Sequence, residues 1–412
     1  MYPHRIRLRG PWGFEPLSAT RVGADGVRSC AGDCPPPGKL KIPTSWAGTP
    51  LEGLHGSVRF RRTFRKPGTL DPDEHLRLVF GGVDYFAHVR LNGVSLGDHG
   101  GYFEPFGFDI TPLVRPHNQL IVDVDRPREI DEGRTRLFQG NGDGAGGGIH
   151  GDVTLEVRPG VRLSDVRLQA APRGPCTPTA VSVTGNVVGE VRHALTLDFS
   201  LNSRQVGYQH ADAAPTRAAF RFDAITDPLS QWTTWDRGTP ALHELRIELH
   251  GGARTLDSRI VRFGVQSPHP AADHDAVPTN LIPHLLPAET WAQRVATLRE
   301  QKVTWVRAPG RVLPTDAYDA LDRTGISVWQ DFPVGPSPST DRDVVAEATR
   351  QARAMVGQLR RHPSIATWCC GAPASSAVNE LHEAVRQAIQ QEDPLRPCAL
   401  LGPGSLVGAG RK

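Results

Sequence analysis

The hydrophobic pattern changes once along this chain, and that change limits the possible folds more than any other feature. Up to about residue 265, apolar and polar residues alternate in short runs, which is typical of half-buried β-strands. From Trp291 onward, apolar residues recur every three or four positions, which is typical of amphipathic helices. The sequence therefore predicts a multidomain β plus α/β protein, with β-sheets first and a parallel α/β part last.

The β-rich part divides into two units of sandwich size. Residues 1–158 predict a first β-sandwich, and its residues 87–91 lead into a tight Asn92-Gly93 turn. Other strands of this unit are expected at residues 58–64, 76–80 and 119–124. Residues 159–265 predict a second sandwich of immunoglobulin size, although they lack a Cys-Trp-Cys pattern. Its strands are expected at residues 161–168, 180–188, 194–201, 218–224, 242–249 and 257–265.

Residues 266–412 predict the α/β part, because short apolar strands there alternate with helical stripes. The strands are expected at residues 303–306, 326–329, 364–368 and 398–401. The helical stripes are Trp291, Val295 and Leu298, then Val345, Ala348, Ala352, Val356 and Leu359, then Val378, Leu381, Val385 and Ile389. Between them, Thr315 is expected to cap a short helix that carries Tyr318 and Leu321, and Gly325 to end it. About four or five βα units are fewer than the eight of a closed barrel, which predicts an incomplete (β/α) TIM-type barrel.

The composition excludes partners that bind through net charge. The chain has 47 Lys and Arg against 44 Asp and Glu, which argues against a nucleic-acid or membrane-surface role. No apolar run approaches the roughly 18 residues of a membrane-spanning helix. Residues 1–16 are basic and mixed, without the apolar core of a signal peptide, so we expect a cytoplasmic protein.

The six cysteines are too few for a disulfide scaffold. Cys30 and Cys34 lie in a loop rich in Gly and Pro, where they either pair or stay free. Cys369 and Cys370 are adjacent at the end of a predicted buried strand, and reduced structural thiols are the simplest interpretation. Because no cluster of His and Cys lies near them, we expect no metal and no cofactor.

Several segments, in order, resemble glycoside hydrolase family 2. In the β-rich part these are residues 42–46, 56–64, 82–85, 89–99, 106–111, 147–153, 240–243 and 262–265. In the α/β part, residues 318–322, 325–332 and 361–369 are similar to the β-mannosidase and exo-β-glucosaminidase branch. The resemblance implies a jelly-roll-like sugar-binding β-sandwich, an immunoglobulin-like β-sandwich and a TIM-type barrel. It also implies a retaining β-glycosidase, which hydrolyses O-glycosyl bonds with two carboxyl groups.

The sequence departs from this family where its catalytic acid is expected. In the mannosidase branch the acid/base glutamate ends a Trp-Cys-Gly-Asn-Asn-Glu motif, and here only Trp368 and Cys369 match. The glutamate position falls at Pro373, or at Ala374 with a one-residue insertion, and the next carboxylate downstream is Glu380 in a predicted helix. The family nucleophile lies on a later strand that this sequence does not contain. We therefore expect a degenerate, C-terminally truncated member with no intact catalytic residue.

A third departure lies after the strand at 303–306. The branch has a Trp-Gly-Gly-Gly-like turn that lines the sugar pocket, whereas here Arg307 is followed by Ala308, Pro309 and Gly310. The stacking indole of that turn is therefore absent.

Four residues are candidates for carbohydrate contact. Trp329 and Asp331 end a predicted parallel strand, where an indole stacks on a sugar ring and a carboxylate binds its hydroxyl groups. Alternatively, Asp331 holds a loop through backbone hydrogen bonds. Asp84 and Asn92 lie in the first sandwich, in a polar stretch with Asp98 and His99, although Asn92 is also a turn residue.

Two histidines are candidates for general bases. His150 and His362 have the side chain for that role, and local hydrogen bonds are the alternative function of each.

The sequence leaves three functions open. The first is a catalytically impaired member that binds carbohydrate or another protein through its sandwiches. The second is an active β-glycosidase, of β-mannoside or β-glucosaminide type, with relocated carboxylates or a second chain that completes the barrel. The third is an assembly module, such as a homo-oligomer formed through uncovered strand edges, or a truncated gene product.

Overall fold

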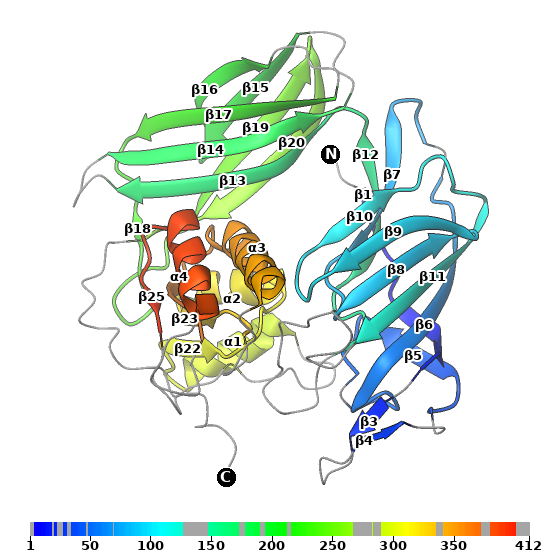
Figure 1. Ribbon diagram of the computed structural model, residues 1–412. Coiled ribbons are helices and arrows are strands. Elements are labelled where there is room, and N and C mark those ends of the chain that lie inside the picture. Colours follow the sequence, from blue (N-terminus) through cyan, green and yellow to red (C-terminus); the bar gives the residue numbers. More distant parts are fainter. Residues whose placement is uncertain are drawn as a thin grey trace. The chain divides into compact units, whose positions relative to one another are not determined.

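The structure is a computed structural model with two compact units, each described here by itself (Figure 1). It describes residues 4–18, 20–22, 28–30, 34–46, 48–68, 70–126, 147–172, 178–189, 194–211, 216–266, 282, 290–334, 341–371 and 380–400. One unit covers Pro3–Arg158, and the other covers Pro159–Phe332 with Ser339–Lys412. Extended β-sheets precede a parallel sheet with helices, which confirms the predicted multidomain β plus α/β fold. The separation of residues 159–265 from 266–412 into two domains stays a prediction.

The first unit consists of β-strands in two sheets. The strands are β1 (His4–Arg7), β2 (Gly10–Pro16), β3 (Thr20–Val22), β4 (Arg28–Cys30), β5 (Gly38–Ile42), β6 (Leu54–Arg65), β7 (Glu74–Phe80), β8 (Phe86–Leu91), β9 (Val94–Gly100), β10 (Phe106–Asp109), β11 (His117–Arg126) and β12 (Val153–Pro159). One sheet has the order β1-β12-β7-β10, and the other contains β4-β3-β6-β11-β8-β9 with β2 and β5 attached. The four predicted runs lie in β6, β7, β8 and β11, as expected.

The alternation of apolar and polar residues explains this sandwich. Strand β11 buries every second side chain, as a strand with one face on the core does. Its Val122 lies opposite Phe60 of β6, and both are fully buried. The β8–β9 hairpin closes through Asn92 (φ 52°) and Gly93 (φ 86°), the left-handed pair that a two-residue loop requires. The predicted Asn92-Gly93 turn is thus confirmed.

The second sandwich has two antiparallel sheets around one core. Its strands are β13 (Arg162–Pro172), β14 (Thr179–Val188), β15 (Leu195–Leu201), β16 (Arg204–Ala211), β17 (Arg217–Thr226), β18 (Gln231–Trp232), β19 (His243–Gly251), β20 (Arg254–Phe263) and β21 (Val265–Gln266). The short strands β18 and β21 pair in parallel as a separate two-stranded sheet. Sheet β13-β14-β17 and sheet β16-β15-β19-β20 contribute to the same buried cluster, which includes Leu168, Val183, Leu197 and Ile247. The sequence prediction missed β16, because this edge strand buries only Ala211 fully and its residues do not alternate in polarity.

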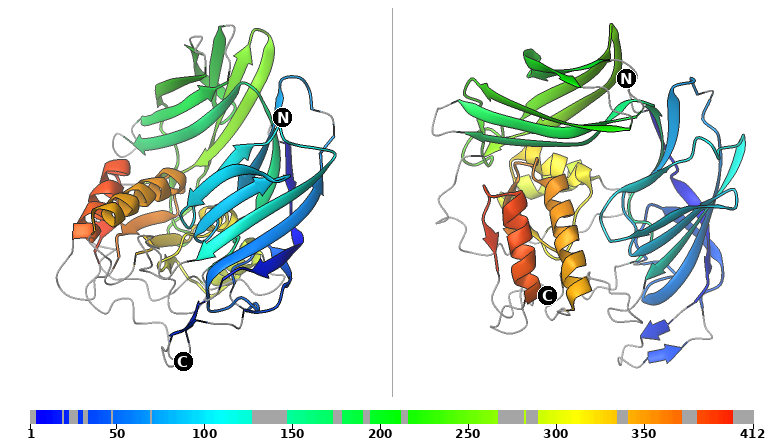
Figure 2. Two further views of the ribbon diagram at one scale, coloured as in Figure 1. Left: turned by 45° about the vertical axis from the view of Figure 1, so that its right-hand side comes forward. Right: turned by 45° about the horizontal axis from the view of Figure 1, so that its top comes forward.

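The α/β part follows with one parallel sheet of four strands. Its elements are α1 (Trp291–Glu300), β22 (Trp305–Ala308), α2 (Thr315–Thr324), β23 (Ser327–Asp331), α3 (Arg342–Leu359), β24 (Ile365–Cys369), α4 (Glu380–Glu392) and β25 (Cys398–Ala399). The strands pair in chain order, β22-β23-β24-β25, and every pair is parallel. Helices α3 and α4 lie side by side (Figure 2). The predicted βαβα order is confirmed, and the incomplete TIM-type barrel stays a prediction.

The ends of α2 and the start of α3 test the helix boundaries that were predicted from the sequence. Gly325 has φ 77° and ends α2 in the left-handed conformation, as expected. The expected cap at Thr315 is wrong: Pro314 is the N-cap, and Thr315 is already the first helical residue. A proline immediately before a helix fixes the extended backbone that a cap position needs, which displaced the cap by one residue. In α3, Val344 is buried and Val345 is only half-buried, so the buried face of this helix begins one residue before the predicted start at Val345.

Hydrogen bonds join the second sandwich to the α/β part within one compact unit. The Trp232 indole nitrogen donates to the carbonyl of Asp322 at 2.8 Å. The Gln266 amide donates to the carbonyl of Ile365 at 2.7 Å, and its oxygen accepts from Arg396 Nε at 2.9 Å. A Cβ on Gly264 would lie 2.6 Å from Pro363, so the two parts approach closely only because residue 264 is glycine.

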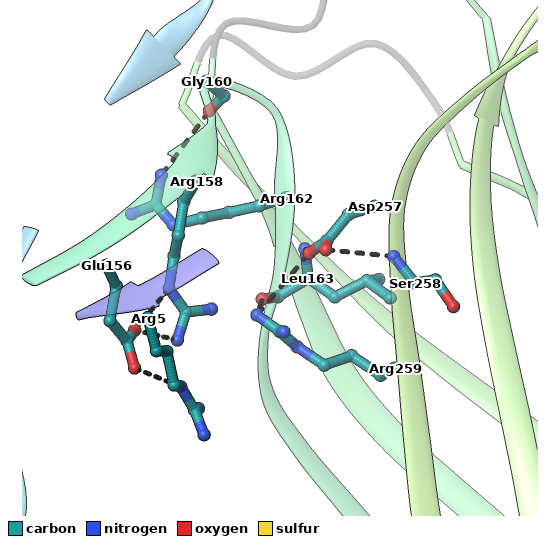
Figure 3. Close-up of polar contacts among 9 residues, drawn as sticks. All are labelled: Arg5, Glu156, Arg158, Gly160, Arg162, Leu163, Asp257, Ser258 and Arg259. Atoms are coloured by element: carbon teal, nitrogen blue, oxygen red, sulfur yellow. Dashed lines mark hydrogen bonds and ion pairs between the residues drawn. The ribbon is translucent and has the colours of Figure 1, made fainter. Parts of the chain in front are cut away.

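Buried carboxylates fix strands within each unit (Figure 3). In the first unit, Glu156 accepts from Arg5 Nε at 2.7 Å and from Arg158 Nε at 2.8 Å. In the other unit, Asp257 accepts the backbone N–H groups of Leu163 and Ser258, each at 2.9 Å. Since these carboxylates already have partners, they act as structural ties and not as free acids.

Among the residues that the structure describes, none of the helices combines the length and hydropathy needed to cross a membrane.

Candidate functional site

The ends of the four parallel strands gather the candidate residues of the α/β part. Because the strands are parallel, their carboxyl ends lie at the same edge of the sheet. The strands end at Ala308, Asp331, Cys369 and Ala399. Of these four residues only Asp331 carries a carboxylate.

The register assigns a polar set of side chains to one face of this sheet. Arg307 lies beside Trp329, Trp329 beside Thr367, and Asp331 beside Cys369. Neighbouring residues of a parallel sheet point to the same face, so these five side chains share one face. The opposite face packs on helices, as shown by the 2.6 Å hydrogen bond between Gln330 and the Tyr318 hydroxyl of α2.

Asp331 is bound by Arg307 in a buried ion pair. The Arg307 guanidinium donates from Nη2 to Asp331 Oδ2 at 2.8 Å and from Nε to both carboxylate oxygens, at 3.1 and 3.2 Å. Their side chains are only 4% and 2% exposed. Burial raises the pKa of the Asp331 carboxyl, while the Arg307 guanidinium opposes that shift. The carboxylate also accepts a backbone hydrogen bond from Gly310, which holds the segment after β22.

Trp329 lies on the same face as this ion pair, and its indole nitrogen is unusual for a buried polar atom. The residue is 4% exposed, so its ring has no free face for stacking on a sugar in this conformation. Its indole nitrogen is buried and has no hydrogen-bond partner within the described residues, and the same holds for the Thr367 hydroxyl. Buried polar groups without partners are rare and mark places where a ligand or water binds. Carbohydrate contact by Trp329 and Asp331 stays a prediction.

The two candidates in the first sandwich have internal roles. Asp84 is fully buried and accepts the backbone N–H of Gly147. Asn92 donates to the Leu113 carbonyl and to Asn118, each at 3.0 Å, and accepts the Gln119 N–H at 2.9 Å. Direct sugar contact by Asp84 or Asn92 also stays a prediction, and their present contacts hold the first sandwich together.

Both histidine candidates are hydrogen-bonded; His362 is buried and His150 is half-buried. His150 Nε2 lies 2.6 Å from the Tyr102 carbonyl, and burial lowers the pKa of this imidazole. His362 Nδ1 lies 2.6 Å from Asp322, whose other oxygen accepts the N–H of Ser364 at 3.0 Å. These contacts fit the structural alternative: those of His362 join α2 to the start of β24, and that of His150 holds the backbone at Tyr102.

Asp319, Asp322 and His362 also form a group in which one ligand atom of each lies within 4.8 Å of the others. Asp322 is already engaged by His362 and Ser364, so the group is explained as a tie between elements. The contacts of these three residues give no second indication of a bound cation.

The expected acid/base position lies outside the described residues. Pro373 and Ala374 both fall in the segment 372–379. Glu380 is the exposed first residue of α4. The site that the structure describes therefore consists of Arg307, Asp331, Trp329 and Thr367.

The sequence analysis did not predict that Asp331 pairs with Arg307. It named Arg307 only as the residue that precedes the altered turn at Ala308, Pro309 and Gly310. The sequence contained one usable signal, because Arg307 and Asp331 lie at the ends of two predicted buried strands and charged residues buried there must pair. The register that places them on one face is known only from the structure.

A family model described as the glycosyl hydrolase 2 galactose-binding domain-like domain matches residues 55–141. A β-glucuronidase of Bacteroides fragilis is 22% identical over 87% of this chain and 57% of its own length. β-Mannosidase B of Thermothelomyces thermophilus is 24% identical over 80% of this chain and 44% of its own length. The chain thus spans about half the length of these curated relatives.

Solved structures show the same fold. A β-glucuronidase of Bacteroides uniformis has a TM-score of 0.74 at 17% identity, covering 97% of this chain and 52% of that one. A β-D-mannosidase from Dictyoglomus thermophilum has a TM-score of 0.72 at 17% identity, covering 97% and 57%. At these identities the likeness concerns the fold.

Proposed function

We propose that this chain, which belongs to glycoside hydrolase family 2, binds carbohydrate without the family's acid–base chemistry. One observation carries the proposal. The segments that follow the four parallel strands contain no Asp or Glu: they are residues 309–314, 332–340, 370–379 and 400–412. Catalytic side chains of parallel α/β enzymes come from these strand ends and from the loops after them. The sequence at hand therefore supplies one strand-end carboxylate, Asp331.

A single carboxylate at the described strand ends is one fewer than glycoside hydrolysis uses. Retaining and inverting mechanisms both need two carboxyl groups, one that protonates the leaving oxygen and one that acts as nucleophile or base. Asp331 forms a bidentate ion pair with Arg307, which holds both its oxygens away from a substrate. These two facts favour binding over turnover.

The proposed ligand is a β-linked glycoside. The relatives named above are glucuronidases and mannosidases, and the matching family model is galactose-binding domain-like. The indole N–H of Trp329 and the hydroxyl of Thr367 supply a donor and a donor–acceptor on the face that carries Asp331. Sugar hydroxyl groups are suitable partners for such groups.

Two measurements test this function. Aryl β-mannoside, β-glucosaminide, β-galactoside and β-glucuronide are incubated with the chain, and the corresponding methyl glycosides are titrated by calorimetry. We expect no turnover above that of an Asp331→Asn control, and saturable binding of at least one glycoside that weakens in Thr367→Val. Turnover that is lost in Asp331→Asn, with circular dichroism showing that variant to be folded, would refute the loss of catalysis. Absence of binding to all four sugars would refute the ligand.

An active glycosidase with relocated carboxylates is the second candidate. Its specific support is Asp331, because burial raises the pKa of this carboxyl and a general acid needs such a shift. The same hydrolysis assay separates the two candidates. A second chain that completes the barrel is a variant of this candidate, and mixing the chain with such a polypeptide would then restore turnover.

Assembly through the sheet edges is the third candidate. Within the described strands, β22 and β25 each have one neighbour, so each presents an outer edge. Light scattering of the purified chain distinguishes a homo-oligomer from a monomer.

A further inference from the structure

Two cysteines meet where β24 and β25 pair. In this parallel pair, Trp368 lies beside Cys398 and Cys369 beside Ala399. The backbone N–H of Cys370, directly after β24, donates to the Ala399 carbonyl at 3.0 Å, so the pairing continues one residue further. Because side chains alternate between faces, Cys370 shares the face of Trp368 and Cys398.

The thiols of Cys370 and Cys398 are in contact. The hydrogen bond between them is the largest contribution that raises the pKa of Cys370, followed by burial. Cys370 Sγ also lies 3.2 Å from the Ala399 carbonyl. Neither thiol is bonded to another cysteine, and Cys398 is the more exposed of the two.

Cys369 has different surroundings although it is the neighbour in sequence. Its thiol lies 3.7 Å from the Gly371 carbonyl, and it faces the side of the sheet that carries Asp331. Burial raises the pKa of Cys369 well above its ordinary value. Cys369 and Cys370 therefore point to opposite faces, which excludes them as partners of each other in this conformation.

One cation lies near the paired thiols. Arg386 of α4 interacts electrostatically with both Cys370 and Cys398, and it is held by Glu383 through Nε at 2.9 Å. A fixed guanidinium stabilises a thiolate, which is the form that reacts with oxidants. Cys398 is the more exposed of the two thiols, so an oxidant from solvent reaches it first.

We propose that Cys370 and Cys398 are an oxidation site that closes to an intramolecular disulfide when a hydroperoxide is present. The Cys398 thiolate attacks the peroxide, the O–O bond breaks, and sulfenic acid forms with release of water or an alcohol after protonation. The Cys370 sulfur then attacks the Cys398 sulfur, the S–O bond breaks, and a second water leaves. Overall the two thiols lose two protons and two electrons, which reduce the hydroperoxide to water and an alcohol, or to two waters when it is hydrogen peroxide.

Closure requires β25 to move, because Cys398 lies beside Trp368 and not beside Cys370. Strand β25 is a two-residue edge strand with β24 as its neighbour in the described sheet, so it can follow the approach of the sulfur atoms. The inference is independent of the proposed carbohydrate binding, because neither thiol lies on the face that carries Arg307 and Asp331.

Peptide mapping tests the proposal on the full chain. The protein is treated with hydrogen peroxide, its remaining thiols are alkylated, and it is digested with trypsin. Peptides 362–386 and 387–411 are expected to be joined, because trypsin does not cleave between Arg396 and Pro397. The joined species is expected to lack two hydrogens and to separate after treatment with dithiothreitol.

Serine variants assign the bond. Cys369→Ser and Cys34→Ser are matched controls and are expected to keep the link, whereas Cys398→Ser is expected to lose it. Cys370→Ser is also expected to lose it, and circular dichroism shows whether this variant is folded. A link within peptide 362–386, a link that survives Cys398→Ser, or alkylation of both Cys370 and Cys398 after oxidation would each overturn the proposal.

Discussion

At the scale of single residues, the pair of Arg307 and Asp331 shows how a buried carboxylate at a strand end is held by a counter-ion. Both side chains are almost completely buried, and the guanidinium satisfies both carboxylate oxygens. A free carboxylate at a strand end would be available for catalysis, whereas this one is a component of the protein interior. The chemical behaviour of Asp331 thus depends on its ion pair with Arg307 and not only on its position at the end of a strand.

Removing one member of this pair is expected to destabilise the α/β part strongly. Asp331→Asn leaves the Arg307 charge buried without a counter-ion, which costs about 3–5 kcal/mol in the free energy of unfolding. The double variant Arg307→Met/Asp331→Leu is expected to recover most of that loss, because no charge remains buried. Urea unfolding measures both. The exposed pair Arg204–Asp227, broken by Asp227→Asn, is the control and is expected to change stability little.

His150 and His382 predict a pH dependence. Burial lowers the pKa of His150 and of His382, so the folded state binds fewer protons than the unfolded state below the ordinary value of about 6.5. Stability is therefore expected to be complete above that pH and to fall as the pH drops below it, by up to about 1.4 kcal/mol per pH unit for each histidine.

Denaturant unfolding of wild type and His150→Gln between pH 5 and 7.5 checks this expectation. The variant is expected to have the shallower slope below pH 6.5 and the same slope above it. Equal slopes over the whole range would show that His150 does not titrate in this way.

At the scale of elements, the end of α2 depends on one glycine for two reasons. Gly325 has φ 77°, and a Cβ there would lie 2.8 Å from the backbone nitrogen of Trp235. The Trp235 N–H in turn donates to the Gly325 carbonyl at 3.0 Å. The glycine thus ends the helix and also lets the second sandwich approach it.

Gly325→Ala is expected to lower the free energy of unfolding by more than the roughly 1 kcal/mol of left-handed strain. Gly252→Ala is the matched control, because Gly252 has φ 62° and its Cβ would meet nothing within 4 Å. The difference between the two variants, measured by thermal unfolding, reports the close approach. Equal losses would mean that Trp235 moves aside freely.

At the scale of the whole molecule, one arginine connects much of the second compact unit. Arg396 donates to Asp393 at 2.7 Å, to the Arg360 carbonyl at 2.9 Å and to Gln266 at 2.9 Å. The side-chain amide of Gln266 in turn donates a hydrogen bond to the carbonyl of Ile365 in β24. The second sandwich and the α/β part are therefore coupled through buried polar bonds, in agreement with their single compact unit.

Arg396→Met is expected to weaken this coupling. The variant keeps the aliphatic length of the side chain but leaves Asp393 and the amide oxygen of Gln266 without this donor, at a cost of about 1–3 kcal/mol for each such group. Differential scanning calorimetry is expected to show the α/β transition at a lower temperature than in wild type. Arg353→Met, on the exposed side of α3, is the control; an equal shift in both would contradict the role of Arg396.

The strands and helices were predictable wherever local periodicity and burial agree. Strand β14, whose residues alternate, was found almost to its ends, whereas β16 was missed because an edge strand has little need to alternate. The motifs also gave the correct family, since several segments in order are hard to match by chance. The acid/base position at Pro373 or Ala374 was a prediction from alignment, and it lies outside the described residues.

The sequence by itself determined the order of elements, the family and the absence of Asp and Glu from the segments after the parallel strands, because periodicity and composition are local properties. Only the tertiary structure decided that Asp331 is paired with Arg307, that Trp329 is covered, and that Cys370 meets Cys398 and not Cys369. Those facts depend on strand register and on which face a side chain occupies, and a shift of one residue in register reverses the face.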